Sequence, residues 1–123
     1  MSSFCDMTAT DLRQMIGRKD ISPVELVEAS IERIEMVDPS LNAFVTKNYE
    51  AARKTAKIAE KNVLEGELLG LLHGLPIGIK DLEATAGLRT TLGSKLYADH
   101  VPTADLGVVA NCLLYTSDAA DDM

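Results

Sequence analysis

Aromatic residues are scarce in this sequence, and tryptophan is absent. Only 4% of the residues are aromatic, so the chain has few rings on which nucleic-acid bases could stack. Positive charge is also limited, because 12 Lys and Arg residues face 19 Asp and Glu residues and give a formal net charge of −7. A chain with this charge repels a phosphate backbone. We therefore expect no direct nucleic-acid binding.

Cysteine and histidine are too few for the usual metal and disulfide sites. The two cysteines, Cys5 and Cys112, lie far apart in the sequence, and His73 and His100 are the only histidines. This content indicates neither a zinc site nor a disulfide framework. We expect no metal and no cofactor.

Long hydrophobic runs are missing as well. The longest uncharged run of the central region, 68–79, has 12 residues and is interrupted by Gly and Pro, whereas a membrane helix needs about 20 apolar residues. The N-terminal MSSFCDM lacks the basic start and apolar stretch of a signal peptide. Because the hydrophobic content is 46% and the charged content 25%, the composition is typical of a globular protein. We expect a cytoplasmic protein with no membrane segment.

The spacing of apolar residues predicts two helices. One runs from Thr8 or Thr10 to about Arg18, with Thr10 as the N-cap. The other runs over 49–64, where apolar residues recur at steps of three and four and form a narrow packing seam. The seam consists of Tyr49, Ala52, Ala56, Ala59 and Val63.

A further helix between these two has a strong N-terminal signal. Ser22 is in the N-cap position, Pro23 in the first helical position, and Glu25 completes a capping box. We expect this helix to end at Asp38-Pro39, because the residue before a proline is disfavoured in the helical region.

Two short strands are predicted over 41–47 and 75–79, where β-forming or continuous apolar residues are bounded by Gly, Pro and Asn. The segment between the third helix and the second strand is predicted to be a loop. The order helix, helix, strand, helix, strand is typical of an α/β protein, and 123 residues are about one domain.

The stretch GLPIGIKD, 74–81, combines an apolar run with an adjacent lysine and aspartate. It is not a phosphate-binding P-loop, because Ile79 separates Gly78 from Lys80. In addition, Asp81 occupies the place of the hydroxyl residue and would repel phosphate.

Lys80 has two interpretations from the residues alone. It is either the solvated end of a strand or a lysine held at the carboxyl end of a buried strand, where α/β proteins build their sites. Burial disfavours the ammonium form, and a neutral lysine can act as a general base.

The motifs HGLPIGIKD (73–81), TAGLRTTLGS (85–94) and ADHVPTAD (98–105) resemble the start of the amidase signature family, as does the upstream 21–46. The resemblance covers about Leu12 to Asn111. It implies the N-terminal part of an α/β/α fold with a mixed central sheet, truncated here. The family includes amidases, which hydrolyse carboxylic amides, and the A subunit of the glutamine-dependent aminoacyl-tRNA amidotransferase.

The resemblance implies that Lys80 is the base of a Ser–cisSer–Lys triad. The Gly/Ser-rich segment that supplies both serines in the family is absent from these 123 residues. We therefore expect the chain itself to be inactive. Arg89 is interpreted as a surface residue, with pairing to a carboxylate as the alternative, and His73 and His100 as structural residues. For Asp81, hydrogen bonding to neighbouring groups and simple exposure both remain open. Supporting roles are expected for Asp81, Gly74, Pro76, Gly78, Thr90, Thr91, Gly93 and Ser94.

The last twelve residues, 112–123, resemble the translation of a transposon-type sequencing adapter. Without this tail the net charge is about −4, since three acids and no bases are removed. We expect an N-terminal helical segment over 1–21, a partial amidase domain over 22–111, and a non-native tail over 112–123.

Two further alternatives remain open from the sequence. The chain could be a small non-enzymatic α/β interaction domain, or it could be part of an amidotransferase rather than of a free-standing amidase. The expected partners are a small amide substrate and either a second copy of the protein or amidotransferase subunits.

Overall fold

The N-terminus of helix α2 (Pro23–Leu41) is capped as the sequence predicts. The Ser22 Oγ accepts a hydrogen bond from the Glu25 backbone N–H at 3.0 Å, and the Glu25 carboxylate accepts one from the Ser22 N–H at 3.4 Å. Pro23 stands at the first helical position, where the missing N–H costs nothing. The predicted capping box is therefore confirmed.

The predicted end of this helix at Asp38-Pro39 is wrong. In the computed structural model the helix continues through Pro39 to Leu41 and stops where Asn42 adopts a left-handed conformation, with φ 55° and ψ 40°. A proline this close to the end removes only its own N–H from the helical ladder, so one more half-turn can form beyond it. Asparagine tolerates the left-handed conformation better than most residues.

Helices α1 (Ala9–Gly17) and α3 (Tyr49–Leu64) agree with the predicted ranges. The N-cap of α1 is Thr8 rather than Thr10, because the Thr8 Oγ1 accepts the Asp11 backbone N–H at 3.1 Å. The small-residue seam of α3 faces inward, and its buried members are Ala56, Ala59 and Val63.

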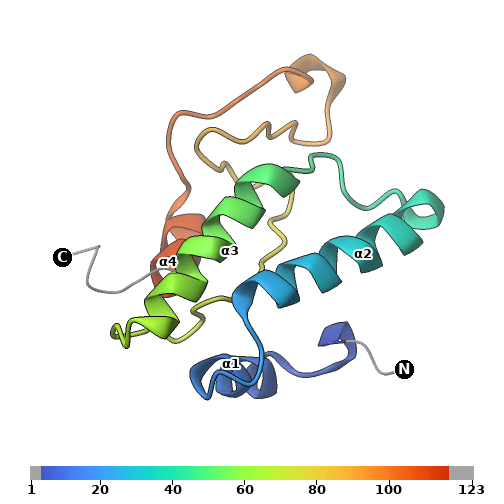
Figure 1. Cartoon of the computed structure of the whole chain (residues 1–123). Helices are drawn as coiled ribbons and strands as arrows, with labels where there is room; N and C mark the ends of the chain where they lie inside the picture. Colours follow the sequence, from blue (N-terminus) through green and yellow to red (C-terminus); the bar gives the residue numbers. More distant parts are fainter. Residues whose placement is uncertain (1–3, 117–123) are drawn as a thin grey trace.

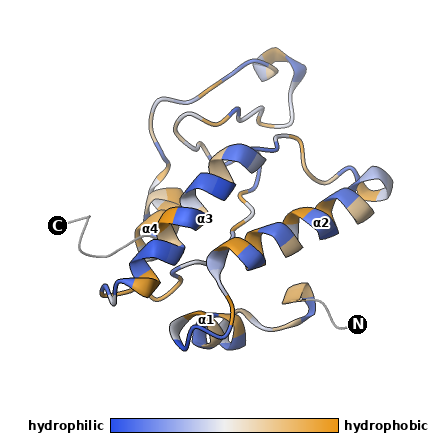
Figure 2. Ribbon diagram, viewed as in Figure 1, coloured by the Kyte–Doolittle hydropathy of each residue, from blue (hydrophilic) through white to orange (hydrophobic). Residues whose placement is uncertain are grey.

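Helices α2 and α3 contact each other, and α2 also contacts the short 3₁₀ helix η1 (Phe4–Asp6). In Figure 1 α1 lies below the other two helices, near the N-terminal end of α2. Figure 2 shows that the visible side of α3 is largely hydrophilic, in keeping with its buried seam on the other side. The main core cluster consists of Leu12, Ile16, Ile21, Leu26 and Val63.

The structure describes residues 4–116, and within this range no residue belongs to a β-strand. Segments 41–47 and 75–79 therefore do not form the predicted strands in the described part of the chain, and the mixed sheet is not confirmed by it. A strand requires hydrogen bonds to a neighbouring strand. Here Asp38 accepts the N–H groups of Ala43 and Phe44, Pro76 has no N–H, and Leu75 donates its own to Leu72.

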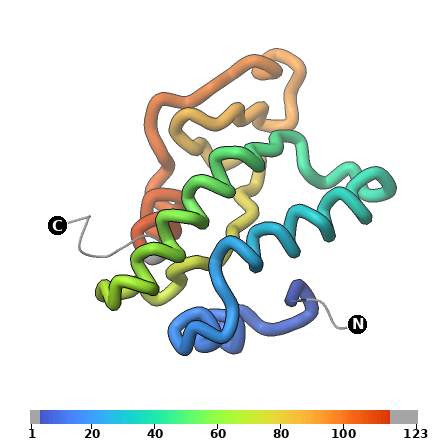
Figure 3. Tube along the Cα trace, viewed as in Figure 1, coloured from blue at the N-terminus to red at the C-terminus, as the bar shows by residue number. Residues whose placement is uncertain are grey.

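After α3 the chain crosses between α2 and α3, as the yellow part of the tube in Figure 3 shows. It then forms a long excursion that contains the 3₁₀ helix η2 (Lys95–Tyr97) and ends at α4 (Gly107–Thr116). Helix α4 crosses the expected domain boundary between 111 and 112 without a break. Residues 117–123 of the expected tail and residues 1–3 of the expected N-terminal segment lie outside the described residues. No helix between residues 4 and 116 is long and apolar enough to cross a membrane.

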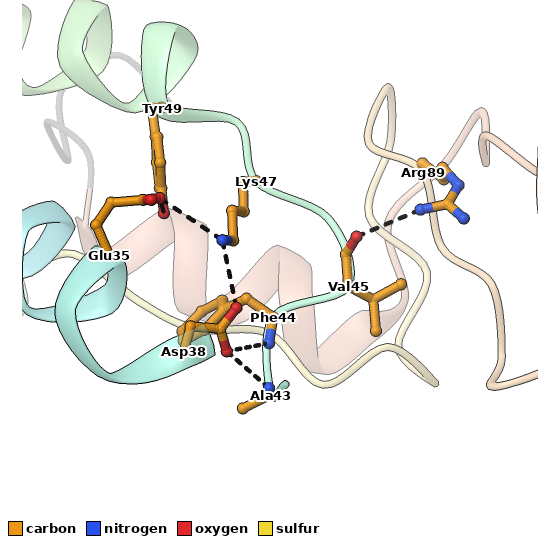
Figure 4. Close-up of polar contacts among 8 residues, drawn as sticks. All are labelled: Glu35, Asp38, Ala43, Phe44, Val45, Lys47, Tyr49 and Arg89. Carbon is orange, nitrogen blue, oxygen red and sulfur yellow. Dashed lines mark hydrogen bonds and ion pairs between the residues drawn. The ribbon is translucent and has the colours of Figure 1, made fainter. Parts of the chain in front are cut away.

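A polar cluster fixes the connection between α2 and α3 (Figure 4). The buried Asp38 carboxylate accepts the backbone N–H of Ala43 at 2.7 Å and of Phe44 at 3.1 Å, and it pairs with the Lys47 ammonium at 3.3 Å. The same ammonium lies 3.6 Å from the Glu35 carboxylate. Hydrogen bonds from the Phe44 and Ala43 backbone, together with Lys47, lower the pKa of Asp38. The carboxylate is therefore ionised and holds the 43–47 segment.

Replacement of the α2 cap, Ser22→Ala, is expected to lower the free energy of unfolding by about 1 kcal/mol, because the Glu25 backbone N–H loses its acceptor, the Ser22 Oγ. The urea midpoint of the whole chain measures this change. Ser40→Ala, at an exposed position in the last turn of α2, serves as the control and should stay within about 0.5 kcal/mol. Equal effects of the two substitutions would contradict the role of the cap.

The Asp38 carboxylate predicts a pH dependence of stability. Its pKa is lower in the folded state than the unfolded value of about 3.9, so its contribution is present above that value and is lost as the pH falls through the folded pKa. Asp38→Asn should therefore lower the melting temperature at pH 7. The difference from the unsubstituted protein should shrink as the pH is lowered from about 5 towards 2. A difference that stays constant over this range would show that ionisation of Asp38 does not matter.

Candidate active site

An apolar groove of about 700 Å³ lies between α2, α3 and two irregular segments, 43–49 and 74–81. The helices contribute branched aliphatic side chains and alanines, since the α3 seam continues into the groove wall. The aromatic ring of Phe44 and the side chains of Ile77 and Ile79 contribute from the two segments. The apolar part of this helical lining includes Val27, Ile31, Ile34, Ala52, Ala56 and Ala59.

Lys80 lines this groove at the end of the apolar run. Its side chain is exposed and makes no hydrogen bond or ion pair within residues 4–116. Its backbone carbonyl accepts the Glu83 N–H at 2.9 Å and so begins a turn. The described residues therefore do not provide the burial that one of the two interpretations of Lys80 requires.

Asp81 is held by hydrogen bonds from Thr91 and Leu92, which lie ten and eleven residues later in the sequence. Its carboxylate accepts the backbone N–H of Thr91 at 2.8 Å and also the Thr91 hydroxyl, while its carbonyl accepts the Leu92 N–H at 2.9 Å. These bonds from Thr91, with smaller effects of the Gly93 backbone and of Arg89, lower the pKa of the Asp81 carboxyl group. Of the two alternatives for Asp81, the structure shows hydrogen bonding.

The residues before Lys80 set the path of the chain into the groove. Gly74 has φ +80°, and a Cβ at this position would lie 2.9 Å from Pro23 Cγ and 3.2 Å from Ile16 Cδ1. A residue with a side chain would be strained at this positive φ, and its Cβ would also clash with the side chains of Pro23 and Ile16. At Gly78 the nearest atom to such a Cβ is Phe44 Cε1 at 3.9 Å, so that position has room.

Thr90, Thr91, Gly93 and Ser94 form turns beside Asp81. Thr90 and Thr91 are buried, and the Thr90 N–H donates to the His100 carbonyl at 2.9 Å. The Ser94 N–H donates to the Thr91 carbonyl at 3.0 Å, and the Ser94 Oγ accepts the Leu96 N–H at 3.2 Å. The structure thus joins Asp81 to Thr91, and the Gly93 N–H donates to the Thr91 hydroxyl at 3.3 Å, whereas Ser94 caps η2.

The contacts given for the two histidine rings are with residues other than Lys80. His73 is 1% exposed, and its Nε2 lies 3.0 Å from the Ala59 carbonyl, which ties the turn before Gly74 to α3. The Nδ1 of this ring has no hydrogen-bond partner among residues 4–116. The exposed His100 ring packs edge-on against Tyr97, with ring centroids 5.8 Å apart. Neither contact indicates a catalytic role.

Arg89 is the residue whose role the sequence interpretation missed. It was expected at the surface, but it is half-buried and its guanidinium donates to the carbonyl of Val45 at 3.4 Å and to that of Ala98. Figure 4 shows the first of these bonds reaching across to the segment that Asp38 holds. The acceptors lie 9 and 44 residues away in sequence, so no local pattern could have indicated them.

The site as described offers one amine beside a fixed carboxylate at the mouth of an apolar groove. A lysine amine can transfer protons, but covalent catalysis also requires a nucleophile. The described part of the chain places no serine hydroxyl among the groove residues except Ser30, whose Oγ donates to the Leu26 carbonyl at 2.9 Å. No group of three or more His, Cys, Asp or Glu residues able to hold a metal occurs between residues 4 and 116.

Known proteins resemble this chain over most of its length. The A subunit of the glutamyl-tRNA(Gln) amidotransferase of Gluconobacter oxydans is 42% identical over 113 residues, which are 92% of this chain and 23% of that protein. An acylamidase of Rhodococcus erythropolis is 40% identical over 103 residues, which are 84% of this chain and 22% of that protein. The chain thus spans about a quarter of the length of these curated relatives.

The fold is similar to that of a solved enzyme as well. The crystal structure of a bacterial aryl acylamidase of the amidase signature family matches 90% of this chain and 24% of its own, with a TM-score of 0.84 and 33% identity. The family model named Amidase matches residues 25–113, which include most of α2, all of α3, Lys80 and Asp81. On this match, the chain belongs to the Amidase family.

Proposed function

We propose that this chain is the N-terminal part of an amidase that hydrolyses the C–N bond of carboxylic amides. The observation that carries the proposal is the family match over 25–113, because it includes the groove and Lys80. Relatives named as acylamidases support hydrolysis of an amide. Family membership also favours an enzyme over the small interaction domain that the sequence left open.

Lys80 is the base in this proposal. It takes a proton through a bridging serine from the nucleophilic serine, which then attacks the amide carbonyl. Backbone N–H groups stabilise the oxyanion, and the protonated lysine helps to return the proton to the leaving amine. Both serines would come from a part of the relatives that this chain does not cover, so the 123 residues alone have no turnover.

In the longer protein we also propose that 75–80 joins a mixed sheet. The segment carries apolar residues on a path between α2 and α3, and Ile77 is exposed in the groove. Neighbouring strands would bury this apolar surface and satisfy its backbone groups. They would also remove water from Lys80 and favour its neutral form.

A second candidate function is that of one component of an amidotransferase. The relative at 42% identity is the A subunit of the glutamyl-tRNA(Gln) amidotransferase. Such a protein would work with partner subunits and deliver ammonia from an amide to a charged tRNA. We favour the free-standing hydrolase, in which a small amide is the substrate.

Replacement of the base, Lys80→Ala, in the longer protein encoded by the genomic continuation should lower kcat for simple amides by more than about 10⁴-fold. Loss of a general base costs roughly 10²–10⁴-fold, and members of a triad act as a unit. Lys54→Ala, an exposed lysine on α3, is the control and should keep full activity. The 123-residue chain, assayed alongside, should be inactive. Near-normal turnover by a folded Lys80→Ala protein would refute the role of Lys80.

The two candidate functions predict different dependence on partners. The free-standing hydrolase should turn over simple aliphatic or aryl amides as a purified single protein. Addition of amidotransferase partner subunits should leave kcat unchanged. Amide hydrolysis that appears only with those subunits, accompanied by conversion of Glu-tRNA(Gln), would favour the amidotransferase instead.

A further inference from the structure

We propose that Arg89 is a positioning residue for Lys80, and that it acts by clamping the 81–92 segment to the connection between α2 and α3. The inference rests on the proposed function, since the position of Lys80 matters only if its amine reacts. None of the hydrogen bonds that the Arg89 side chain makes to the described residues goes to Lys80. It acts through a series of hydrogen bonds that begins at α2 and ends at the backbone next to Lys80.

The first step is the anchored wall of the groove. The Asp38 carboxylate at the end of α2 fixes Ala43 and Phe44 through their N–H groups and holds Lys47 by an ion pair. Residues 43–47 are therefore attached to the helical body at both ends. Any group bound to this segment takes its position from α2 and α3.

The second step is the clamp itself. The Arg89 guanidinium donates to the Val45 carbonyl at 3.4 Å and to the Thr46 Oγ1 at 3.5 Å, while the Thr46 hydroxyl donates back to the Arg89 carbonyl at 3.0 Å. A further bond from Arg89 Nε reaches the Ala98 carbonyl. One planar, multivalent cation thus joins three segments, which the single point charge of a lysine cannot do.

The third step carries this position to Lys80. Two residues after Arg89, Thr91 gives its N–H and its hydroxyl to the Asp81 carboxylate, and the Leu92 N–H reaches the Asp81 carbonyl at 2.9 Å. Asp81 follows Lys80 directly, so these three bonds hold the side chain and the carbonyl of the residue next to the lysine. Catalytic groups must be held to within about 0.5 Å, and a misplacement of about 1 Å can cost roughly 10²-fold in rate.

The test first uses the 123-residue chain, without any assay of activity. In NMR relaxation and hydrogen-exchange measurements, Arg89→Ala should lower the backbone order parameters of Lys80 and Asp81 and speed exchange of the Leu92 amide. The pKa of the Asp81 carboxyl group, followed by its ¹³C shift, should rise towards the ordinary aspartate value. Arg18→Ala, which breaks an exposed pair with Asp20, is the matched control and should change none of these signals.

Conservative variants distinguish the clamp from a simple effect of charge. Arg89→Lys keeps the positive charge but loses the fork, so it should behave like Arg89→Ala. If Arg89→Lys restores the signals of Lys80 and Asp81, the clamp is refuted. Should Arg89→Ala fail to fold, Thr46→Val removes the shared hydroxyl with little change of shape. It should give the same changes in smaller measure, and unchanged signals would overturn the proposal.

The kinetic arm uses the longer enzyme. Arg89→Ala should lower kcat by about 10–100-fold and change KM by less than about threefold, because the base is misplaced while the apolar side chains of the groove are unchanged. A rise in KM at unchanged kcat would contradict positioning of Lys80. Failure of the proposed function is seen separately, as an active Lys80→Ala enzyme, and would not alter the NMR result.

Discussion

The absence of a side chain at Gly74 is the constraint on which the path of the chain towards Lys80 depends. Pro23 and Ile16 approach this glycine so closely that a Cβ would meet Pro23 at 2.9 Å. The start of α2 and the inner face of α1 therefore press directly on the backbone from which the Lys80 segment departs. His73, one residue earlier, is bound to α3 through the Ala59 carbonyl. Three helices thus determine where the apolar run begins.

The other end of that run is fixed by polar contacts rather than by packing. The Asp81 carboxylate binds Thr91, and Arg89 binds the segment that Asp38 holds at the end of α2. Between the glycine and these bonds lie only six residues, 75–80, whose side chains line an apolar groove. Lys80 is therefore exposed but not loosely attached, since its backbone is held from both directions.

Local signals made α1, α2 and α3 predictable from the sequence. The Ser22 capping box and the alanine seam of α3 lie within a few residues of the structure they specify. The end of α2 was missed because Asp38 acts forward, on Ala43 and Phe44, rather than as a helix breaker. The two strands were predicted but do not form, because strand formation depends on partners that residues 4–116 do not supply. The Arg89 clamp was beyond prediction, as it joins residues more than forty apart.

The contacts that close the helical unit have a consequence for the order in which the protein folds during synthesis. The Arg13 guanidinium reaches the Gly70 carbonyl across 57 residues, and the core cluster ends at Val63, with Leu75 packed against it. A ribosome has therefore released every residue of this core before Asp81 and Thr91 can meet. The residues of the three helices are thus available to pack together before the Asp81–Thr91 bonds can form. The Lys80 turn can then be placed on a surface that already exists.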